Sequence, residues 1–257
     1  MKFLKNKTIM ITGGTGSFGN RCAQYLLKNN VKKVIIFSRD ELKQSEMAIK
    51  FNSPKLRFLL GDVRDRERLK LATKKVDIII HAAALKQVPT CEYFPYEAVQ
   101  TNIIGAHNIT RAIREGQTPV KLAIGVSTDK ACKPINVMGM TKAIQERIFI
   151  ESNLNMPETS FVCVRYGNVL ASRGSVLPLF QEQIRTGGPV TITLKEMTRF
   201  LLTLNQAVDT IFAAVRGAKM GETYVPKAPA ARILDVAKIL IGDQDIPIEF
   251  SGVRPGE

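Results

Sequence analysis

One stretch of the sequence concentrates the side chains that could carry out chemistry, Ser127–Lys142, STDKACKPINVMGMTK. Within it, hydroxyl groups, a carboxylate and ammonium groups stand only a few residues apart. These are the groups that enzymes use to give protons to a bound ligand or to take protons from it. Met138 is the exception in the stretch, since a thioether has no proton to transfer.

The elements on either side of this stretch indicate how it is presented. An apolar run over residues 120–126 predicts a strand, and the run from Thr141 to about residue 153 predicts a helix. The carboxyl ends of strands are where an open α/β sheet places its ligand crevice. We therefore expect these side chains to line such a crevice.

A glycine-rich turn near the start of the sequence indicates what binds beside the cluster. Residues 7–12 predict a strand, residues up to Leu27 predict a helix, and GGTGSFG lies between them. Strand, glycine-rich turn and helix in this order are typical of a dinucleotide-binding site, where the helix amino terminus donates N–H groups to phosphates. The predicted contacts are Gly13, Thr15, Gly16, Ser17, Phe18 and Gly19.

The end of the second predicted strand, residues 33–37, bears on the choice of cofactor. NAD-binding chains usually carry an acid at this point, whereas this sequence has Ser38, Arg39 and, shortly after, Lys43. A hydroxyl and two cations favour the 2′-phosphate of NADP. Asp40 keeps NAD open as an alternative, and a solvated charged loop is the alternative without a ligand.

The third predicted strand, residues 56–60, supplies two further cofactor contacts. Asp62 can accept a hydrogen bond from adenine, and Val63 can lie beside the ring. A helix is predicted over residues 67–75.

The fourth predicted strand, residues 76–81, leads into the small residues Ala82, Ala83 and Ala84 and then Lys86. Small side chains allow the backbone to approach a cofactor closely, as glycine would. Asn102 opens a predicted helix over residues 103–115 and can brace a strand end with side-chain hydrogen bonds.

The alternation of strands and helices predicts an α/β fold with a Rossmann-like, doubly wound parallel sheet. The regularity weakens after a sixth strand at 160–166, which predicts a smaller mixed substrate lobe interleaved with the sheet. We expect the NADP-binding domain with its catalytic motif to cover residues 1–168 and the substrate lobe to cover 169–257. Within the lobe, helices are predicted at 176–185 and 205–216, and short β segments at 190–194 and 223–227.

Composition limits the classes of protein that remain. The 257 residues are 45% hydrophobic and 23% charged, which is ordinary for a globular chain. The four cysteines and two histidines are scattered, which argues against a metal site and a disulfide framework. The net charge of +14 is spread along the chain without interleaved aromatic residues, so we expect no nucleic-acid partner. No apolar run approaches the roughly 20 residues of a membrane span, which favours a cytoplasmic protein without a membrane partner.

Taken together in their order, the motifs point to one enzyme family. The sequence contains GGTGSFG, SRDELKQ, GDVRD, HAAALK, STDKA, RYGNV, MTRF and VPK. It resembles the inverting UDP-N-acetylglucosamine 4,6-dehydratases (5-epimerising), which are extended short-chain dehydrogenases/reductases. The resemblance implies that NADP⁺ takes a hydride from C4 and returns it to C6, after water is eliminated across C5 and C6. Members of that family continue beyond the position of Glu257, so we expect a truncated or a short chain.

The resemblance also implies roles for the opening stretch. Asp129 would be the acid that helps the C6 hydroxyl leave, and Lys130 the base at C5. Thr128 would hydrogen-bond O4, and Lys142 would hold the nicotinamide ribose. Ser127 and Tyr166 complete the implied cofactor contacts.

Met138 departs from the wider superfamily, which has a tyrosine four residues before the lysine. That tyrosine takes the proton of the C4 hydroxyl. Either another group, Asp129 or Thr128 through water, removes the proton here, or the protein is inactive and only binds nucleotide.

The implied substrate is UDP-N-acetylglucosamine, and the implied assembly is a dimer or hexamer of identical chains. A close alternative is the retaining 4,6-dehydratase. A C4 epimerase or reductase is less favoured, because it would not need Asp129 and Lys130. The implied substrate contacts are Lys86, Asn168, Arg173, Val176, Phe180, Arg199 and Arg254.

Overall fold

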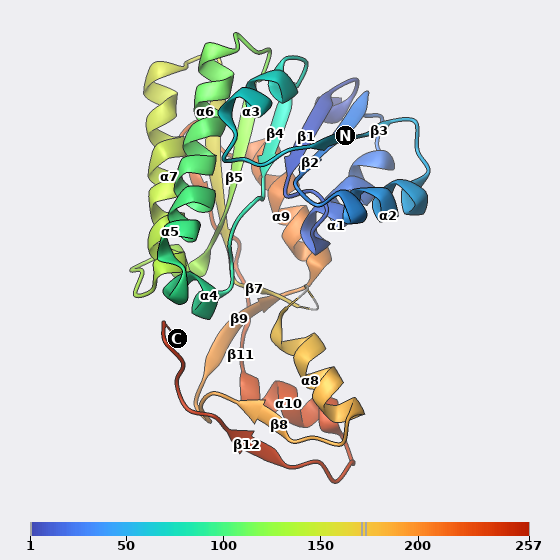
Figure 1. Ribbon diagram of the computed structural model, residues 1–257, viewed down its shortest axis with the longest axis vertical. Coiled ribbons are helices and arrows are strands. Elements are labelled where there is room, and N and C mark those ends of the chain that lie inside the picture. The colour runs from blue at the N-terminus through green and yellow to red at the C-terminus, as the bar shows by residue number, and fades with distance from the viewer. Residues whose placement is uncertain (1, 171, 173, 257) are drawn as a thin grey trace.

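The protein is built around a seven-stranded parallel sheet with the strand order β10-β6-β5-β4-β1-β2-β3 (Figure 1). The computed structural model describes residues 2–256 apart from Ala171 and Arg173. The strand order reverses between β1 and β4, which is the switch point at which such sheets bind ligands. The strands are β1 (Thr8–Thr12), β2 (Lys33–Ser38), β3 (Leu56–Leu60), β4 (Ile78–His81), β5 (Leu122–Thr128), β6 (Ser160–Tyr166) and β10 (Thr223–Tyr224).

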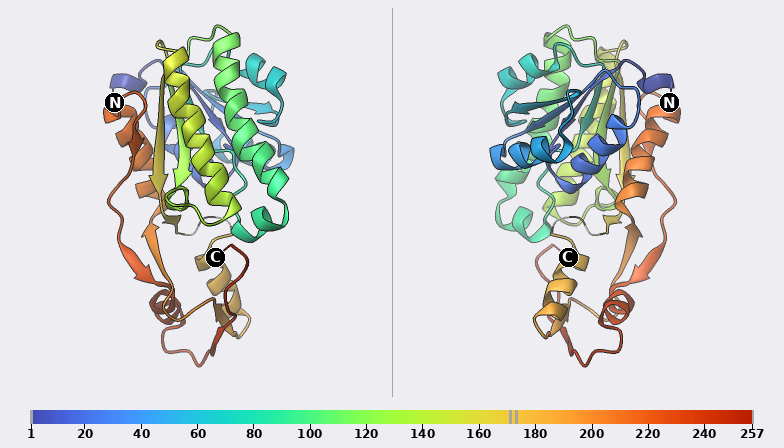
Figure 2. Two further views of the ribbon diagram at one scale, coloured as in Figure 1. Left: turned by 90° about the vertical axis from the view of Figure 1, so that its left-hand side faces the viewer. Right: turned by 90° about the vertical axis from the view of Figure 1, so that its right-hand side faces the viewer.

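Helices cover both faces of the sheet, which explains why its central strands are continuous apolar runs. One face packs against α1 (Ser17–Leu27), α2 (Glu41–Phe51) and α9 (Leu204–Gly217). The other packs against α3 (Arg66–Thr73), α6 (Gly105–Glu115) and α7 (Val137–Asn155). Figure 2 shows the two helical layers from either side. The predicted fold class is confirmed.

The sequence analysis missed α2, because the run ELKQSEMAIKF is highly polar and reads as a solvated loop. Its start is fixed by Asp40, whose carboxylate accepts a hydrogen bond from the backbone N–H of Lys43 at 3.0 Å. It also missed α4 (Val88–Tyr93) and α5 (Pro95–Ala98). A π-helical turn, Val99–Ile104, joins α5 to α6 where the start of a helix was expected.

The small lobe lies at the carboxyl ends of the sheet strands (Figure 1). Its parts are a three-stranded sheet, β11-β9-β7, a parallel pair, β8 with β12, and two helices. A separate apolar cluster around Phe180, Val190 and Ile233 forms its core. The elements are β7 (Asn168–Val169), α8 (Val176–Arg185), β8 (Val190–Ile192), β9 (Thr198–Leu202), β11 (Ala230–Arg232), α10 (Ile233–Ile241) and β12 (Ile248–Phe250).

Two elements from the last third of the chain leave the small lobe and return to the sheet. Helix α9 packs on α1, and β10 pairs with β6. The chain therefore crosses between the two parts several times. Among the helices of the described residues, none combines the length and the apolarity needed to cross a bilayer.

Candidate functional site

The glycine-rich turn closes β1 against the loop that follows β4. Gly13 has φ +65°, and a Cβ built on it would lie 2.8 Å from the Ala83 Cα atom. A Cβ on Gly19 would lie 2.3 Å from the Gly14 carbonyl oxygen, so glycine is required for helix and turn to pack. On Gly16, in contrast, the nearest atom to a Cβ is 3.4 Å away. The space beside Gly16 is open on the side where a cofactor would approach.

The start of α1 suits a diphosphate. Gly16 is the N-cap residue, it offers no side chain to cap the helix, and the first turn contains no acidic residue. The N–H groups of the first turn and the helix dipole favour an anion at this position. The residues present therefore fit a dinucleotide cofactor. On the same turn, the ring of Phe18 lies 6.4 Å from the ring of Tyr166, measured between centroids.

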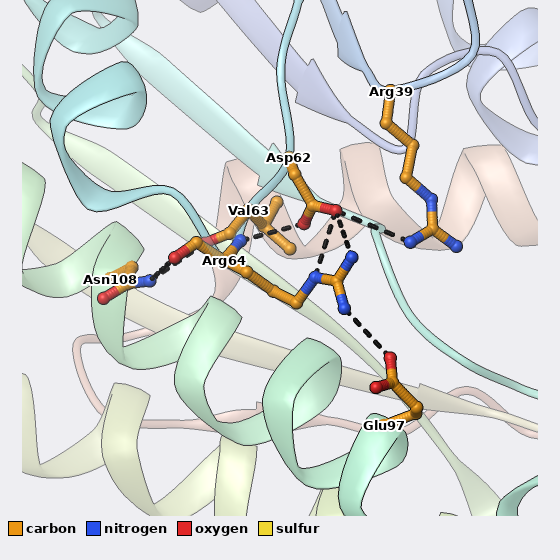
Figure 3. Close-up of polar contacts among 6 residues, drawn as sticks. All are labelled: Arg39, Asp62, Val63, Arg64, Glu97 and Asn108. Carbon is orange, nitrogen blue, oxygen red and sulfur yellow. Dashed lines mark hydrogen bonds and ion pairs between the residues drawn. The ribbon is translucent and has the colours of Figure 1, made fainter. Parts of the chain in front are cut away.

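The turn after β3 presents a fixed carboxylate at the other end of the candidate cofactor site (Figure 3). Asp62 accepts hydrogen bonds from the backbone N–H and the guanidinium of Arg64, at 2.9 and 3.0 Å, and lies 3.5 Å from Arg39. Burial opposes ionisation of Asp62, but Arg64 and Arg39 outweigh it and hold its pKa below the usual value. Asn108 fixes the turn through the carbonyl of Val63, at 3.1 Å. Asp62 is thus an ionised acceptor for a donor such as an adenine amino group.

The residues expected to discriminate between NADP and NAD lie in different environments. Ser38 is buried, and its hydroxyl accepts a hydrogen bond from Gln44. Asp40 caps α2 and forms an ion pair with Lys43. Arg39 remains largely exposed beside Asp62. The carboxylate that kept NAD open is therefore already engaged by a helix terminus and a lysine.

The catalytic candidates converge at the end of β5. Thr128 donates a hydrogen bond to Asp129 at 2.8 Å. The Lys130 Nζ atom lies 3.1 Å from an Asp129 carboxylate oxygen and 3.1 Å from the side-chain oxygen of Asn168. Asn168 comes from β7, so the acid and base candidates contact the segment that enters the small lobe. A cavity of about 120 Å³ adjoins them, lined by Asp129, Arg165, Tyr166, Gly167, Phe200, Val225, Pro226 and Ala228.

Lys142 lies buried on α7, one turn of the helix after Met138. Its ammonium group donates to the side-chain oxygen of Gln145 at 2.5 Å, and Gln145 in turn donates to the Val126 carbonyl. Burial lowers the pKa of Lys142 to about 8, although nearby negative charge opposes the shift. Burial and the charge of Lys142 likewise lower the pKa of His81 to about 3, so this histidine is neutral. Gln145 was missed by the sequence analysis.

An ion pair between the partly buried Arg165 and the buried Glu146 ties β5, β6 and α7 together beneath the site. Glu146 accepts two hydrogen bonds from Arg165, at 2.8 and 2.6 Å, and one from Ser127 at 2.5 Å. Ser127, expected to contact the cofactor, is buried and directs its hydroxyl to this carboxylate instead. The sequence analysis missed Glu146, although its position one turn after Lys142 on the same helix is a usable signal.

The surroundings of Met138 indicate packing and no role in proton transfer. It is 5% exposed and packs in an apolar cluster with Cys91 and Ala98, at the contact of α7 with α4 and α5. Because it fills a core position, its chemistry is that of a packing residue.

Asn102 braces the loop after β4, as expected. Its side chain accepts a hydrogen bond from the Leu85 backbone N–H at 2.8 Å and donates to the Leu85 carbonyl and the Thr141 hydroxyl, each at 3.0 Å. The loop carries Lys86, and partial burial of its ammonium group lowers the pKa of this side chain. The next residue, Gln87, donates to the Gly174 carbonyl at 3.0 Å, which links this loop to the small lobe.

The expected substrate contacts are only partly brought together. Asn168 lies in the catalytic cluster. Arg254 lies on the carboxyl-terminal tail, which is held by a hydrogen bond from the Asn136 side chain to the Gly256 carbonyl. Arg199 is on β9 and donates to the carbonyl of its neighbour Thr198. Arg173 lies outside the described residues.

Two of the expected substrate contacts belong to the core of the small lobe. Phe180 is 1% exposed among the residues of that core, and Val176 packs against the same cluster. Because burial of a large aromatic side chain is strongly favourable, Phe180 stabilises the core of this lobe.

The sheet order, the glycine-rich turn and the buried lysine on α7 define a Rossmann-fold protein of the extended short-chain dehydrogenase/reductase class. Comparison with known proteins agrees. The model of the family described as "Polysaccharide biosynthesis protein" matches residues 9–257. The chain belongs to this family.

The similar proteins carry different names. An uncharacterized membrane protein of Methanocaldococcus jannaschii is 46% identical over 266 residues, covering 99% of this chain and 79% of that protein. A UDP-glucose 4-epimerase of Rickettsia conorii is 48% identical over 260 residues, covering 98% and 76%.

Among solved structures, Pen from Bacillus thuringiensis has a TM-score of 0.95 at 38% identity, covering 99% of this chain and 82% of that one. DesIV of Streptomyces venezuelae, a dTDP-glucose 4,6-dehydratase with NAD bound, has a TM-score of 0.89 at 19% identity, covering 97% and 86%. The second likeness concerns the fold alone.

Proposed function

We propose that the protein is an NADP-dependent UDP-N-acetylglucosamine 4,6-dehydratase that inverts C5, and that it serves the synthesis of a surface polysaccharide or glycan. The observation that carries the proposal is the cluster at the end of β5, where the Lys130 ammonium lies 3.1 Å from both Asp129 and Asn168. Elimination of water needs an acid at C6 and a base at C5 within reach of one sugar ring. Asp129 would supply the acid and Lys130 the base.

The residues divide the proposed reaction between them. The bound nicotinamide cofactor would accept the hydride from C4 and return it to C6. Lys130, as the neutral amine, removes the C5 proton, which the 4-keto group has made acidic. Asp129 gives a proton to the C6 hydroxyl, which leaves as water. After the hydride has returned to C6, a proton from water adds to C5 on the opposite face, and Lys130 loses its own proton to solvent. Lys142, held by Gln145, positions the nicotinamide ribose.

The proton of the C4 hydroxyl has a path that does not involve Met138. Because Thr128 donates to Asp129 at 2.8 Å, a proton taken from O4 can pass through the hydroxyl to the carboxylate. Asp129 can then pass on a proton when the C6 hydroxyl leaves, which balances the two transfers. This relay answers the question raised by a methionine at the usual tyrosine position.

Met138→Leu is therefore expected to retain kcat within about threefold of the parent enzyme. The exchange conserves volume in the apolar cluster around Cys91 and Ala98, so its cost in stability is below about 1.5 kcal/mol. Product formation and thermal denaturation are measured on the same preparation. A loss of kcat beyond about 100-fold with an unchanged Tm would contradict the packing role.

A C4 epimerase is the second candidate, because the Rickettsia relatives are named UDP-glucose 4-epimerase. Epimerisation needs hydride transfer at C4 but neither an acid at C6 nor a base at C5. Incubation of the protein with UDP-N-acetylglucosamine and NADP⁺, followed by NMR of the sugar, separates the two. A 4-keto-6-deoxy product supports the dehydratase, and a C4 epimer alone supports the epimerase.

NADP is the proposed cofactor, with NAD as the alternative found in the DesIV structure. Asp40 is engaged by α2 and Lys43, while Arg39 and Lys43 supply two cations just after β2, and these would suit a 2′-phosphate. Lys43→Ala is expected to weaken NADP⁺ binding about tenfold and to change NAD⁺ binding by less than about twofold. Lys50→Ala, on the last turn of the same helix, is the control and should leave both affinities unchanged.

We also propose that the protein acts in the cytoplasm as a homo-oligomer, either a dimer or a hexamer. Met140 and Ile144 on α7 are each 46% exposed, although they are apolar and follow one another along the helix surface. Apolar side chains in such a position favour contact with a second helix.

A further inference from the structure

The connections that enter the amino ends of the sheet strands have an unusual composition. Across all seven they contain nine lysines, three carboxylates, no arginine and no aromatic residue. The segments are residues 5–7, 28–32, 52–55, 74–77, 116–121, 156–159 and 218–222. We call this surface the lysine edge; its lysines are Lys5, Lys7, Lys28, Lys32, Lys55, Lys74, Lys75, Lys121 and Lys219.

The lysine edge is one continuous surface, because all seven strands are parallel and start at the same side of the sheet. It faces away from the small lobe, toward the top of Figure 1. Backbone hydrogen bonds of 2.9 Å join its connections to one another or to a neighbouring strand: Lys32 N to Lys7 O, Val34 N to Lys55 O, Lys121 N to Asp77 O and Ser160 N to Lys121 O. The register of the sheet therefore brings together lysines that lie more than 200 residues apart in sequence.

Few of these charges are balanced within the chain. Asp77 pairs with Lys7 at 3.5 Å and Glu158 pairs with Lys121 at 3.1 Å. The third carboxylate, Glu222, accepts a hydrogen bond from a backbone N–H. Among the described residues, the others have no ion-pair partner, and six of them are exposed: Lys5, Lys28, Lys32, Lys74, Lys75 and Lys219.

Because the cations of this edge are lysines and not arginines, fewer classes of partner fit it. Lysine is depleted at protein–protein interfaces, where arginine and aromatic residues dominate. Readers of nucleic acid use arginine forks and aromatic stacking, and neither occurs in these connections. Lysines spread over an edge without aromatic residues suit the headgroups of anionic lipids, each contributing through charge alone.

We propose that the lysine edge docks the protein on a membrane surface rich in anionic lipids. The crevice at the opposite ends of the strands then faces away from the bilayer and stays open to soluble ligands. This differs from the expectation of no membrane partner, because surface charge binds a membrane without any spanning helix. The proposal does not depend on the reaction catalysed.

The test is sedimentation of the whole protein with vesicles of phosphatidylcholine, pure or mixed with about a third phosphatidylglycerol. We expect binding to the anionic vesicles alone, falling as ionic strength rises. Lys32→Glu/Lys75→Glu should weaken that binding at least about tenfold. Lys195→Glu/Lys238→Glu, which changes two exposed lysines of the small lobe by the same total charge, should weaken it by less than about threefold.

Three results would overturn the proposal. One is equal binding to neutral and anionic vesicles, and another is an equal loss in both double variants. The third is tighter binding to duplex DNA than to anionic vesicles at the same salt concentration, which would assign the edge to nucleic acid. Thermal denaturation accompanies each measurement, and an unchanged Tm in both variants assigns any loss to the surface charge.

Discussion

Lys130→Ala is expected to lower kcat for the elimination of water at least about 10³-fold while NADP⁺ binds as in the parent. The neutral amine of Lys130 is the only proposed base at C5, and its nitrogen lies 3.1 Å from Asp129 and 3.1 Å from Asn168. Methyl in its place cannot take a proton. Oxidation at C4 does not need Lys130, so reduced cofactor should accumulate and be visible by its absorbance.

The control for this variant is Lys195→Ala, an exposed lysine of the small lobe, which should retain full activity. NMR of the sugar measures elimination, and titration of the cofactor confirms that its site is intact. Retention of more than about a tenth of the parent kcat in Lys130→Ala would remove this residue from the proposed role.

The second large effect concerns the glycine-rich turn, where two alanine substitutions should fail in different ways. In Gly19→Ala the new Cβ would meet the Gly14 backbone at 2.3 Å, so we expect a loss of about 3 kcal/mol or no folded protein. In Gly16→Ala the nearest atom is 3.4 Å away and φ is −70°, so the Tm of the free protein should not fall.

Gly16→Ala should nevertheless weaken NADP⁺ binding at least about 30-fold, because the added methyl occupies the approach of the diphosphate to the start of α1. Thermal denaturation and cofactor titration give the two readouts. Unchanged cofactor affinity in this variant would place the diphosphate elsewhere.

Much of the fold could be predicted from the sequence because its signals are local. The central strands are apolar runs bounded by turns, and β3 and β6 begin and end where the pattern predicts. Helix α2 was missed because its face toward the sheet is narrow, with only Gln44 and Met47 buried. Its capping residue, Asp40, was assigned instead to the cofactor question.

The candidate site, too, could be predicted from the sequence only in part. Residues that stand in short contiguous motifs or at the end of a predicted strand, such as Gly13, Asn102 and the pair Asp129 and Lys130, could be located from the sequence. Which side chains meet across elements could not, because that depends on the register between β5, β6 and α7. The Glu146–Arg165 pair and the burial of Phe180 follow only from that packing.

The most direct test of the central claim is incubation with UDP-N-acetylglucosamine and NADP⁺ in deuterated water, followed by NMR. The proposed mechanism predicts a 4-keto-6-deoxy sugar that carries deuterium at C5, with ring couplings that report inversion at that carbon. A C4 epimer without deuterium at C5, or no turnover by protein that binds NADP⁺, would contradict the claim.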